Sequence, residues 1–283
     1  MIKALLILLW PAGIAAILAV TALLANRPVR SPPPVPAAMN GHNGTDASVS
    51  PRSVQSSIIG LLLILAAAAI VVYALTALLG MLVVHAGPGI DKPIYTWTIH
   101  HRVHFWKLVM DRVTKVGDSW TTWGAATAAA VCLAAFYRRR MWLPLAALGA
   151  AVVLDHYLAL ALRLTVDRAG SPDSPYGAFP SGGCDRIFVF YGLIAFLIWR
   201  EVSGSKRTAI WASGVVAALG FSEAYSRGYL ALHWFTDIVV GLIYGGLILG
   251  AFIVTIRVVD GPAGKAVAEA PARPEAPSRA TIP

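Results

Sequence analysis

Residues 226–237 read SRGYLALHWFTD and combine a fixed cation, an imidazole and a carboxylate within one short stretch. Residues four apart are neighbours on a helix, so Asp237 is expected to accept a hydrogen bond from one ring nitrogen of His233. The other ring nitrogen would then be available as a nucleophile or a base. Arg227 can hold a phosphate group through two parallel hydrogen bonds. The spacing therefore predicts a phosphate-handling site in which His233 and Asp237 are catalytic.

The composition around this segment is that of a membrane protein. Of 283 residues, 57% are hydrophobic and only 13% are charged, which is too apolar for an ordinary soluble domain. The net charge of +9 could suggest nucleic acid, but Lys and Arg lie in short connections between apolar runs. We therefore expect a lipid bilayer as partner and no nucleic acid. A snorkelling arginine beside a helix end is the alternative for residues 226–237, but charges at membrane depth are costly and usually functional.

Seven apolar runs of about 15 to 30 residues are candidates to cross a bilayer as helices, which takes roughly 17 to 25 residues. They cover residues 4–25, 56–85, 119–136, 141–162, 186–200, 208–225 and 238–256. The predicted fold class is all-α, a polytopic membrane bundle with a six-helix core and an extra N-terminal transmembrane helix. The first run could instead be a signal sequence, but it is long and lacks a convincing cleavage site. The predicted parts are this helix (1–25), a disordered linker (26–55), one membrane domain (56–258) and a disordered tail (259–283).

Basic residues in the connections predict which ends of the helices face the cytoplasm. By the positive-inside rule, three connections lie inside, and they carry Arg138, Arg139 and Arg140, then Arg200, Lys206 and Arg207, and finally Arg257. Residues 86–118, 163–185 and 225–237 then face outward, and every chemically suggestive motif falls in them. Within the first of these, residues 91–117 mix aromatic and basic groups as an interfacial helix would. We therefore expect a plasma-membrane protein with an outward-facing site and a cytoplasmic C-terminus.

The pattern Ser-Arg-x5-His-x3-Asp in residues 226–237 resembles the third signature motif of the type-2 phosphatidic acid phosphatase superfamily, the lipid phosphate phosphatases. Every defining residue and both spacings are present, and the resemblance extends over residues 56–257. It implies a six-helix core and a histidine nucleophile that becomes phosphorylated. The family works without a metal, and no cofactor is expected. His100, His101 and His104 lack a partnered Cys or carboxylate set and are expected to pack at the interface.

The second motif of the family, Pro-Ser-Gly-His, resembles Pro180, Ser181, Gly182 and Gly183 of this chain. Ser181 can cap the following helix, and the backbone N–H groups of Gly182 and Gly183 can point at an anion. An ordinary Pro-Ser helix start would explain the same residues. The resemblance assigns the missing imidazole to protonation of the leaving alcohol, and general acid catalysis contributes about 10²- to 10⁴-fold. Gly183 therefore predicts a slower enzyme unless another group supplies the proton.

The first motif, Lys-x6-Arg-Pro, is also incomplete. The alignment places Arg163 at the position of the lysine and Arg168 at an earlier arginine, whereas Gly170 and Ser171 replace the final Arg-Pro. Arg163 keeps the charge, although a guanidinium and an ammonium are not interchangeable. Arg168 and Arg186 are the candidates to replace the missing cation. The predicted phosphate-binding residues are Arg163, Arg168, Ser181, Gly182, Gly183 and Arg227.

Other ionisable residues lie inside the apolar runs. Asp155 and His156 lie in the fourth run, and Glu223 precedes Arg227 by four residues. Each is either functional or part of a buried pair that joins helices.

Two functions remain open on the sequence. The first is a membrane phosphatase or phosphotransferase that acts through a phosphohistidine on polyprenyl phosphates, polyprenyl diphosphates or phosphatidate-like lipids. The alternative is a catalytically impaired protein that binds or transports a lipid phosphate on the same fold. Gly170 and Gly183 favour the alternative, whereas the retained His233 and Asp237 favour the enzyme.

Overall fold

The computed structural model describes residues 51–137, 141–174 and 179–260, which form helices and connections without any strand. The predicted N-terminal helix and most of the predicted linker and tail lie outside these ranges. The first described helix begins at Pro51, so the last residues of the predicted linker are helical.

Five of the six predicted runs from residue 56 onward each coincide with one helix, and the run 186–200 is divided among three consecutive helical elements. The helices are α2 (Pro51–Ala86), α3 (Pro88–His100), α4 (His104–Val113), α5 (Ser119–Phe136), α6 (Trp142–Val166), α7 (Gly182–Arg186), α8 (Leu193–Val202), α9 (Lys206–Tyr229) and α10 (Phe235–Asp260). A short 3₁₀ turn, η1 (Thr114–Gly117), precedes α5, and a π-helical stretch, η2 (Ile187–Gly192), joins α7 to α8. The predicted all-α membrane bundle is confirmed.

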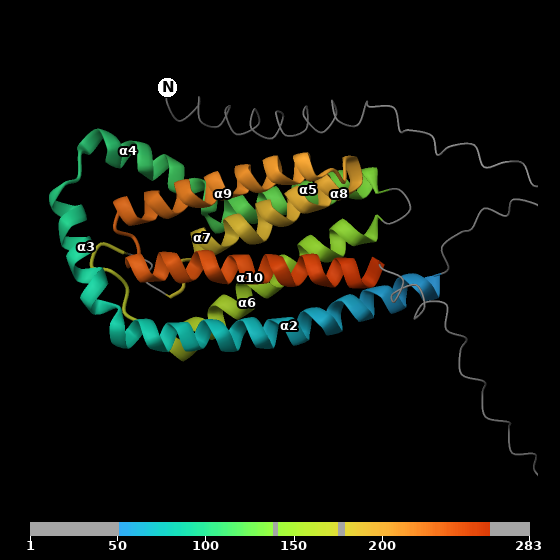
Figure 1. Cartoon of the computed structure of the whole chain (residues 1–283), viewed down its shortest axis with the longest axis horizontal. Coiled ribbons are helices and arrows are strands. Elements are labelled where there is room, and N and C mark those ends of the chain that lie inside the picture. Colours follow the sequence, from blue (N-terminus) through green and yellow to red (C-terminus); the bar gives the residue numbers. More distant parts are fainter. Residues whose placement is uncertain (1–50, 138–140, 175–178, 261–283) are drawn as a thin grey trace, which may run out of the picture.

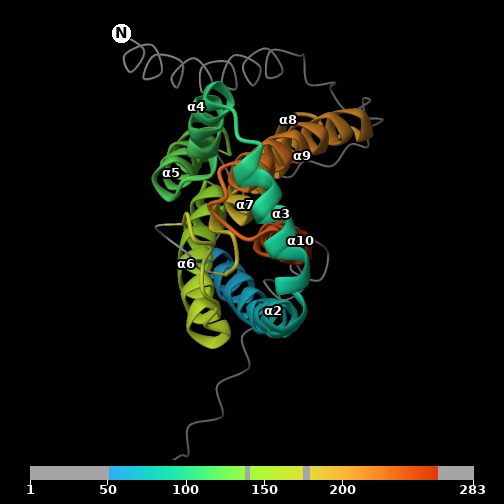
Figure 2. The same cartoon turned by 90° about the vertical axis from the view of Figure 1, so that its left-hand side faces the viewer.

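Four stretches in the described part are both long and apolar enough to cross a membrane, namely Leu63–Ala86, Trp142–Val166, Gly182–Val202 and Phe235–Val258. The long helices run side by side, whereas α3 crosses one end of the bundle (Figure 1). Viewed onto that end, α3 lies in front of α7 and α10 (Figure 2). Trp97, on α3, is 65% exposed, as suits the predicted interfacial segment.

The interior is apolar and so is much of the outer surface. Tyr244, Phe252, Leu148 and Leu197 are fully buried between helices, while Ile70 on α2 remains 70% exposed. Water would penalise so large an exposed apolar surface, but the acyl chains of a bilayer match it. The surface is therefore what a bundle that spans a membrane requires.

Two glycines bring α10 against the start of α7. A Cβ atom at Gly241 would lie 2.7 Å from the carbonyl oxygen of Ser181, and one at Gly245 would lie 2.5 Å from that of Asp185. Small residues four apart let helix backbones approach closely inside membranes. Gly241 and Gly245 therefore let Ser181 and Asp185 lie directly against α10.

Gly245→Ala is expected to destabilise the protein by about 1–3 kcal/mol, because its Cβ would meet backbone that cannot turn away. Gly246→Ala is the matched control, since a Cβ there has no neighbour within 4 Å. Both changes gain the same helix propensity. Thermal unfolding in detergent measures the difference, and equal unfolding temperatures for the two variants would contradict the close packing.

Candidate active site

The candidate site lies at the end of the bundle that α3 crosses, where α9 ends and α10 begins. His233 lies in the turn between them and is only 9% exposed. Ala231 has a positive φ of 52° in this turn, and its carbonyl accepts a 2.6 Å hydrogen bond from the hydroxyl of Ser171. Ser171, which replaces the proline of the first motif, thus holds the turn that carries His233.

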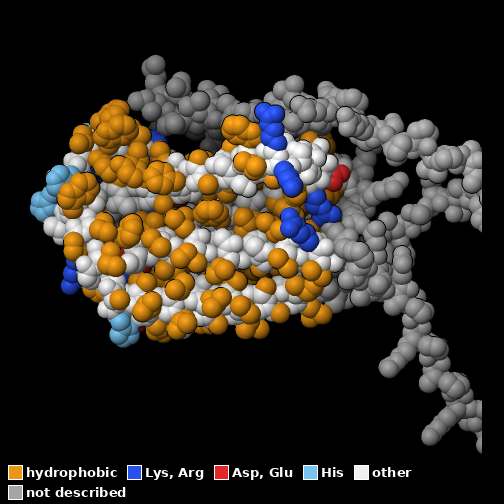
Figure 3. All heavy atoms as spheres, viewed as in Figure 1, with side chains coloured by type: hydrophobic (Ala, Val, Ile, Leu, Met, Phe, Trp, Pro, Cys, Tyr) orange, Lys and Arg blue, Asp and Glu red, His pale blue; other side chains and the backbone are white. Residues whose placement is uncertain are grey.

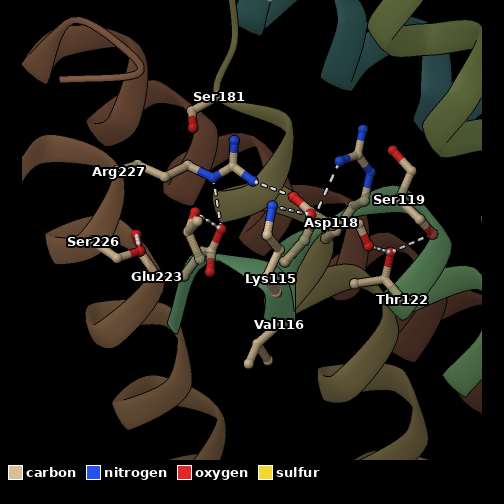
Figure 4. A network of polar contacts seen from close by, with 12 residues as sticks. Lys115, Val116, Asp118, Ser119, Thr122, Ser181, Glu223, Ser226 and Arg227 are labelled. Atoms are coloured by element: carbon tan, nitrogen blue, oxygen red, sulfur yellow. Dashed lines mark hydrogen bonds and ion pairs between the residues drawn. The ribbon is translucent and has the colours of Figure 1, made fainter. Parts of the chain in front are cut away.

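Arg227 reaches across the site from the last turn of α9. Its Nε donates to Oε1 of Glu223 at 2.6 Å, and its Nη2 pairs with Oδ1 of Asp118 at 3.4 Å. Asp118 also pairs with Lys115 at 3.7 Å, so Arg227 belongs to a network that joins α9 to η1 and α5 (Figure 4). Glu223 is 1% exposed, and its ion pair with Arg227 lies within α9, whereas the predicted buried pair was to join two helices.

Arg227 also contacts the imidazole. Its Nη1 lies 3.4 Å from Nε2 of His233. A guanidinium can only donate, so Nε2 accepts and the ring proton belongs on Nδ1. The lone pair of Nε2 therefore faces the cation that would hold a phosphate.

Gly183 makes room for this guanidinium. A Cβ atom there would lie 2.1 Å from Nε and 2.3 Å from Nη2 of Arg227. The arginine side chain therefore occupies the space where a side chain at position 183 would begin. Arg227 can occupy this position only because residue 183 has no side chain.

Ser181 begins α7 but does not cap it as expected. Its carbonyl accepts the N–H groups of Cys184 at 3.1 Å and Asp185 at 3.3 Å, while its hydroxyl lies 3.4 Å from the sulfur of Cys184. Within the described ranges, the N–H groups of Gly182 and Gly183 have no acceptor. Two backbone donors at a helix start therefore remain for an anion.

Asp237 does not contact His233 as the sequence predicts. Its carboxylate pairs with Arg168, which also donates to Thr236 Oγ1 at 2.9 Å and pairs with Asp91. Nδ1 of His233 is buried and has no hydrogen-bond partner among the described residues. The physical reason is local: α10 begins at Phe235, so His233 lies before the helix and the four-residue spacing does not apply.

Asp91 belongs to the site although its sequence context gave no signal. It is 2% exposed, and its two oxygens accept from the N–H of Thr236 at 2.9 Å and its hydroxyl at 2.7 Å. Its contact with Arg168 joins residues that are 77 apart in the chain. The predicted phosphate ligand Arg168 is therefore held by two carboxylates.

Two other arginines, Arg186 and Arg163, are candidate phosphate ligands, and their side chains differ in their contacts. Arg186 pairs with the buried Asp155 at 3.3 Å and donates to the carbonyl of Gly117 at 3.4 Å. Arg163 is exposed near the end of α6, and its side chain makes no hydrogen bond or ion pair with the described residues. Of these two, Arg163 is the one available to an incoming anion.

The environment keeps His233 neutral. Burial, followed by the positive charges of Arg227, Arg163 and Arg186, lowers the pKa of His233 to about 3. An imidazole that is unprotonated at neutral pH is ready to act as a nucleophile.

This pKa predicts a pH-dependent stability. Above the unfolded value of about 6.5 the imidazole is neutral in both states; between 6.5 and about 3 the unfolded chain binds a proton that the folded protein does not. Stability is therefore lost as the pH falls through this window. Relative to His233→Asn, the wild type should lose about 2 kcal/mol between pH 7 and pH 5. Unfolding in detergent at both pH values measures this, and parallel losses in the two proteins would contradict it.

Comparison with known proteins places this geometry on a known fold. The sequence matches no family model and no curated protein. Among solved structures, the chain is similar to a transmembrane PAP2 type phosphatidylglycerolphosphate phosphatase from Bacillus subtilis. The TM-score is 0.59 at 19% identity, over 68% of this chain and 96% of that chain. The protein is therefore an integral membrane protein with the PAP2 fold.

Proposed function

We propose that the protein is a lipid-phosphate phosphatase or phosphotransferase with His233 as its nucleophile. The observation that carries the proposal is the neutral imidazole whose Nε2 lies 3.4 Å from the guanidinium of Arg227. Nε2 forms a bond to phosphorus while the bond from phosphorus to the leaving oxygen breaks, and that oxygen keeps the electron pair. Water or an alcohol then attacks phosphorus and gives its proton to the solvent, while Nε2 leaves with the electron pair of the phosphorus–nitrogen bond.

Arg163, Arg227 and the backbone N–H groups of Gly182 and Gly183 would hold the non-bridging oxygens of the phosphate. Preorganised donors of this kind supply much of the transition-state stabilisation in phosphoryl transfer. Ser181 would hold this turn in place. In this proposal Arg168 positions Asp237 and does not bind phosphate, because two carboxylates already occupy it.

The arrangement at Gly183 favours a diphosphate as substrate. Arg227 fills the space of the missing imidazole and cannot deliver a proton, because a guanidinium stays charged in proteins. It can stabilise a leaving group that departs as an anion, and a phosphate is such a group. Polyprenyl diphosphates are therefore the leading substrates, ahead of polyprenyl phosphates and phosphatidate-like lipids.

The basic connections support a site on the outer face of the plasma membrane, with a cytoplasmic C-terminus. The site and the connection that carries Lys206 and Arg207 lie at opposite ends of α9.

One observation favours the alternative, a protein that binds or transports a lipid phosphate without turnover. The imidazole lacks the carboxylate that would orient it, since Asp237 pairs with Arg168. A binding protein needs the cations but no oriented nucleophile.

Phosphate release by the purified full-length protein separates the two functions. The substrates are polyprenyl diphosphate, polyprenyl phosphate and phosphatidate in detergent micelles, with binding of each lipid measured in parallel. The enzyme should release phosphate, fastest from the diphosphate. Binding of these lipids without release would overturn the enzyme and support the alternative.

A further inference from the structure

A cavity lies between η2 and α8, the N-terminal half of α9 and the C-terminal half of α10. It is a groove of about 330 Å³, lined mainly by apolar side chains such as Phe196, Trp199, Val216, Leu249 and Ile253. Its volume is within the range of sites that bind small ligands. From Asp237 to Ile253, α10 rises by about 24 Å, at about 1.5 Å per residue. The end of the groove that carries Ile253 and Arg257 therefore lies at the opposite end of the bundle from the candidate active site.

A cation lines this apolar groove. The guanidinium carbon of Arg257 lies 5.9 Å from the ring centroid of Phe196, and the side chain is exposed. No carboxylate among the described residues pairs with it. Arginine binds phosphate through its planar fork and stacks on aromatic rings, which leaves its outer edge open to an anion.

The surroundings add positive charge. Lys and Arg side chains gather at the end of the molecule where α8 ends and α9 begins (Figure 3). Lys206 and Arg207, both exposed, begin α9 there, and Glu201 is an acidic residue at the same end. The charge at this end therefore complements an anion.

We infer that this groove binds an anionic phospholipid of the bilayer, with an acyl chain in the slot and the phosphate at Arg257. Two of the three helices that form it cross the membrane, so the slot opens among acyl chains. Basic pockets between transmembrane helices on the cytoplasmic side are suited to anionic head groups. Zwitterionic lipids would fill the slot equally well but would gain less at the arginine. This inference is independent of the proposed reaction.

The test is lipid retention by the full-length protein in detergent micelles doped with phosphatidylglycerol or phosphatidylcholine, read by native mass spectrometry. The wild type should bind phosphatidylglycerol more tightly, and Arg257→Gln should weaken that binding by about tenfold, as loss of a charge-assisted contact predicts. Arg112→Gln, which removes an exposed cation on α4, is the matched control and should have no effect.

A second pair of variants tests the slot itself. Ser213 lines the groove, so Ser213→Phe should fill it and reduce retention of phosphatidylglycerol. Val215, 59% exposed on α9 and outside the groove, gives the control Val215→Phe. Equal retention of both lipids, or equal effects within either pair of variants, would overturn the inference. So would a photo-crosslinker at position 213 that captures residues 1–50 or a second copy of the chain in place of a phospholipid.

Discussion

His233→Ala is expected to abolish phosphate release, with a fall on the order of 10⁴-fold or more. In the proposed reaction, Nε2 of His233 forms the bond to phosphorus that replaces the bond to the leaving group. Loss of the nucleophile in comparable covalent enzymes removes nearly all catalysis that positioning alone does not supply. Its side chain lies in a turn and contacts Arg227 at only one nitrogen, so the helices do not depend on it. Phosphate release and lipid binding should therefore respond differently to this substitution.

The matched control is His104→Ala, which removes an exposed histidine at the start of α4. It should leave release unchanged. With the diphosphate substrate, the wild type should also form a phosphoenzyme that survives alkali and is lost in acid, and His233→Ala should not. If His233→Ala released phosphate at the wild-type rate, His233 would not be the nucleophile.

The sequence predicted the helices well because the requirement that defines them is local. A bilayer demands an apolar run of a certain length, and such a run is visible without knowledge of its neighbours. The pairing of Glu223 with Arg227 was visible for the same reason, since both residues lie on α9 four positions apart. The same spacing failed for His233 and Asp237, because the helix begins between them.

The contacts that the sequence could not provide are long-range. Asp91 reaches Arg168 and Thr236 from a segment that carries no recognised motif. These contacts depend on how α3 crosses the end of the bundle, which neither apolar length nor residue spacing determines. As a result Arg168, an expected phosphate ligand, pairs with Asp91 and Asp237.

Gly183→His is expected to lower phosphate release by about 10²-fold or more, although it restores the residue that the second motif lacks. Its Cβ would lie 2.1 Å from Nε of Arg227, so the guanidinium must leave its place. The guanidinium of Arg227 would then lose its ion pairs with Glu223 and Asp118 and would no longer point toward the proposed phosphate position. Removing one preorganised donor to a developing charge costs about 10²- to 10³-fold.

Gly183→Ala separates the two effects of that substitution, because it adds the same Cβ without an imidazole. If displacement of Arg227 dominates, the two variants should lose activity to a similar extent. If the imidazole supplies part of the missing acid, Gly183→His should exceed Gly183→Ala while staying below the wild type. Both should lower the unfolding temperature to a similar extent, because moving the guanidinium leaves the buried carboxylate of Glu223 without its partner. A rate for Gly183→His above that of the wild type would show that an acid, and not the position of Arg227, limits this site.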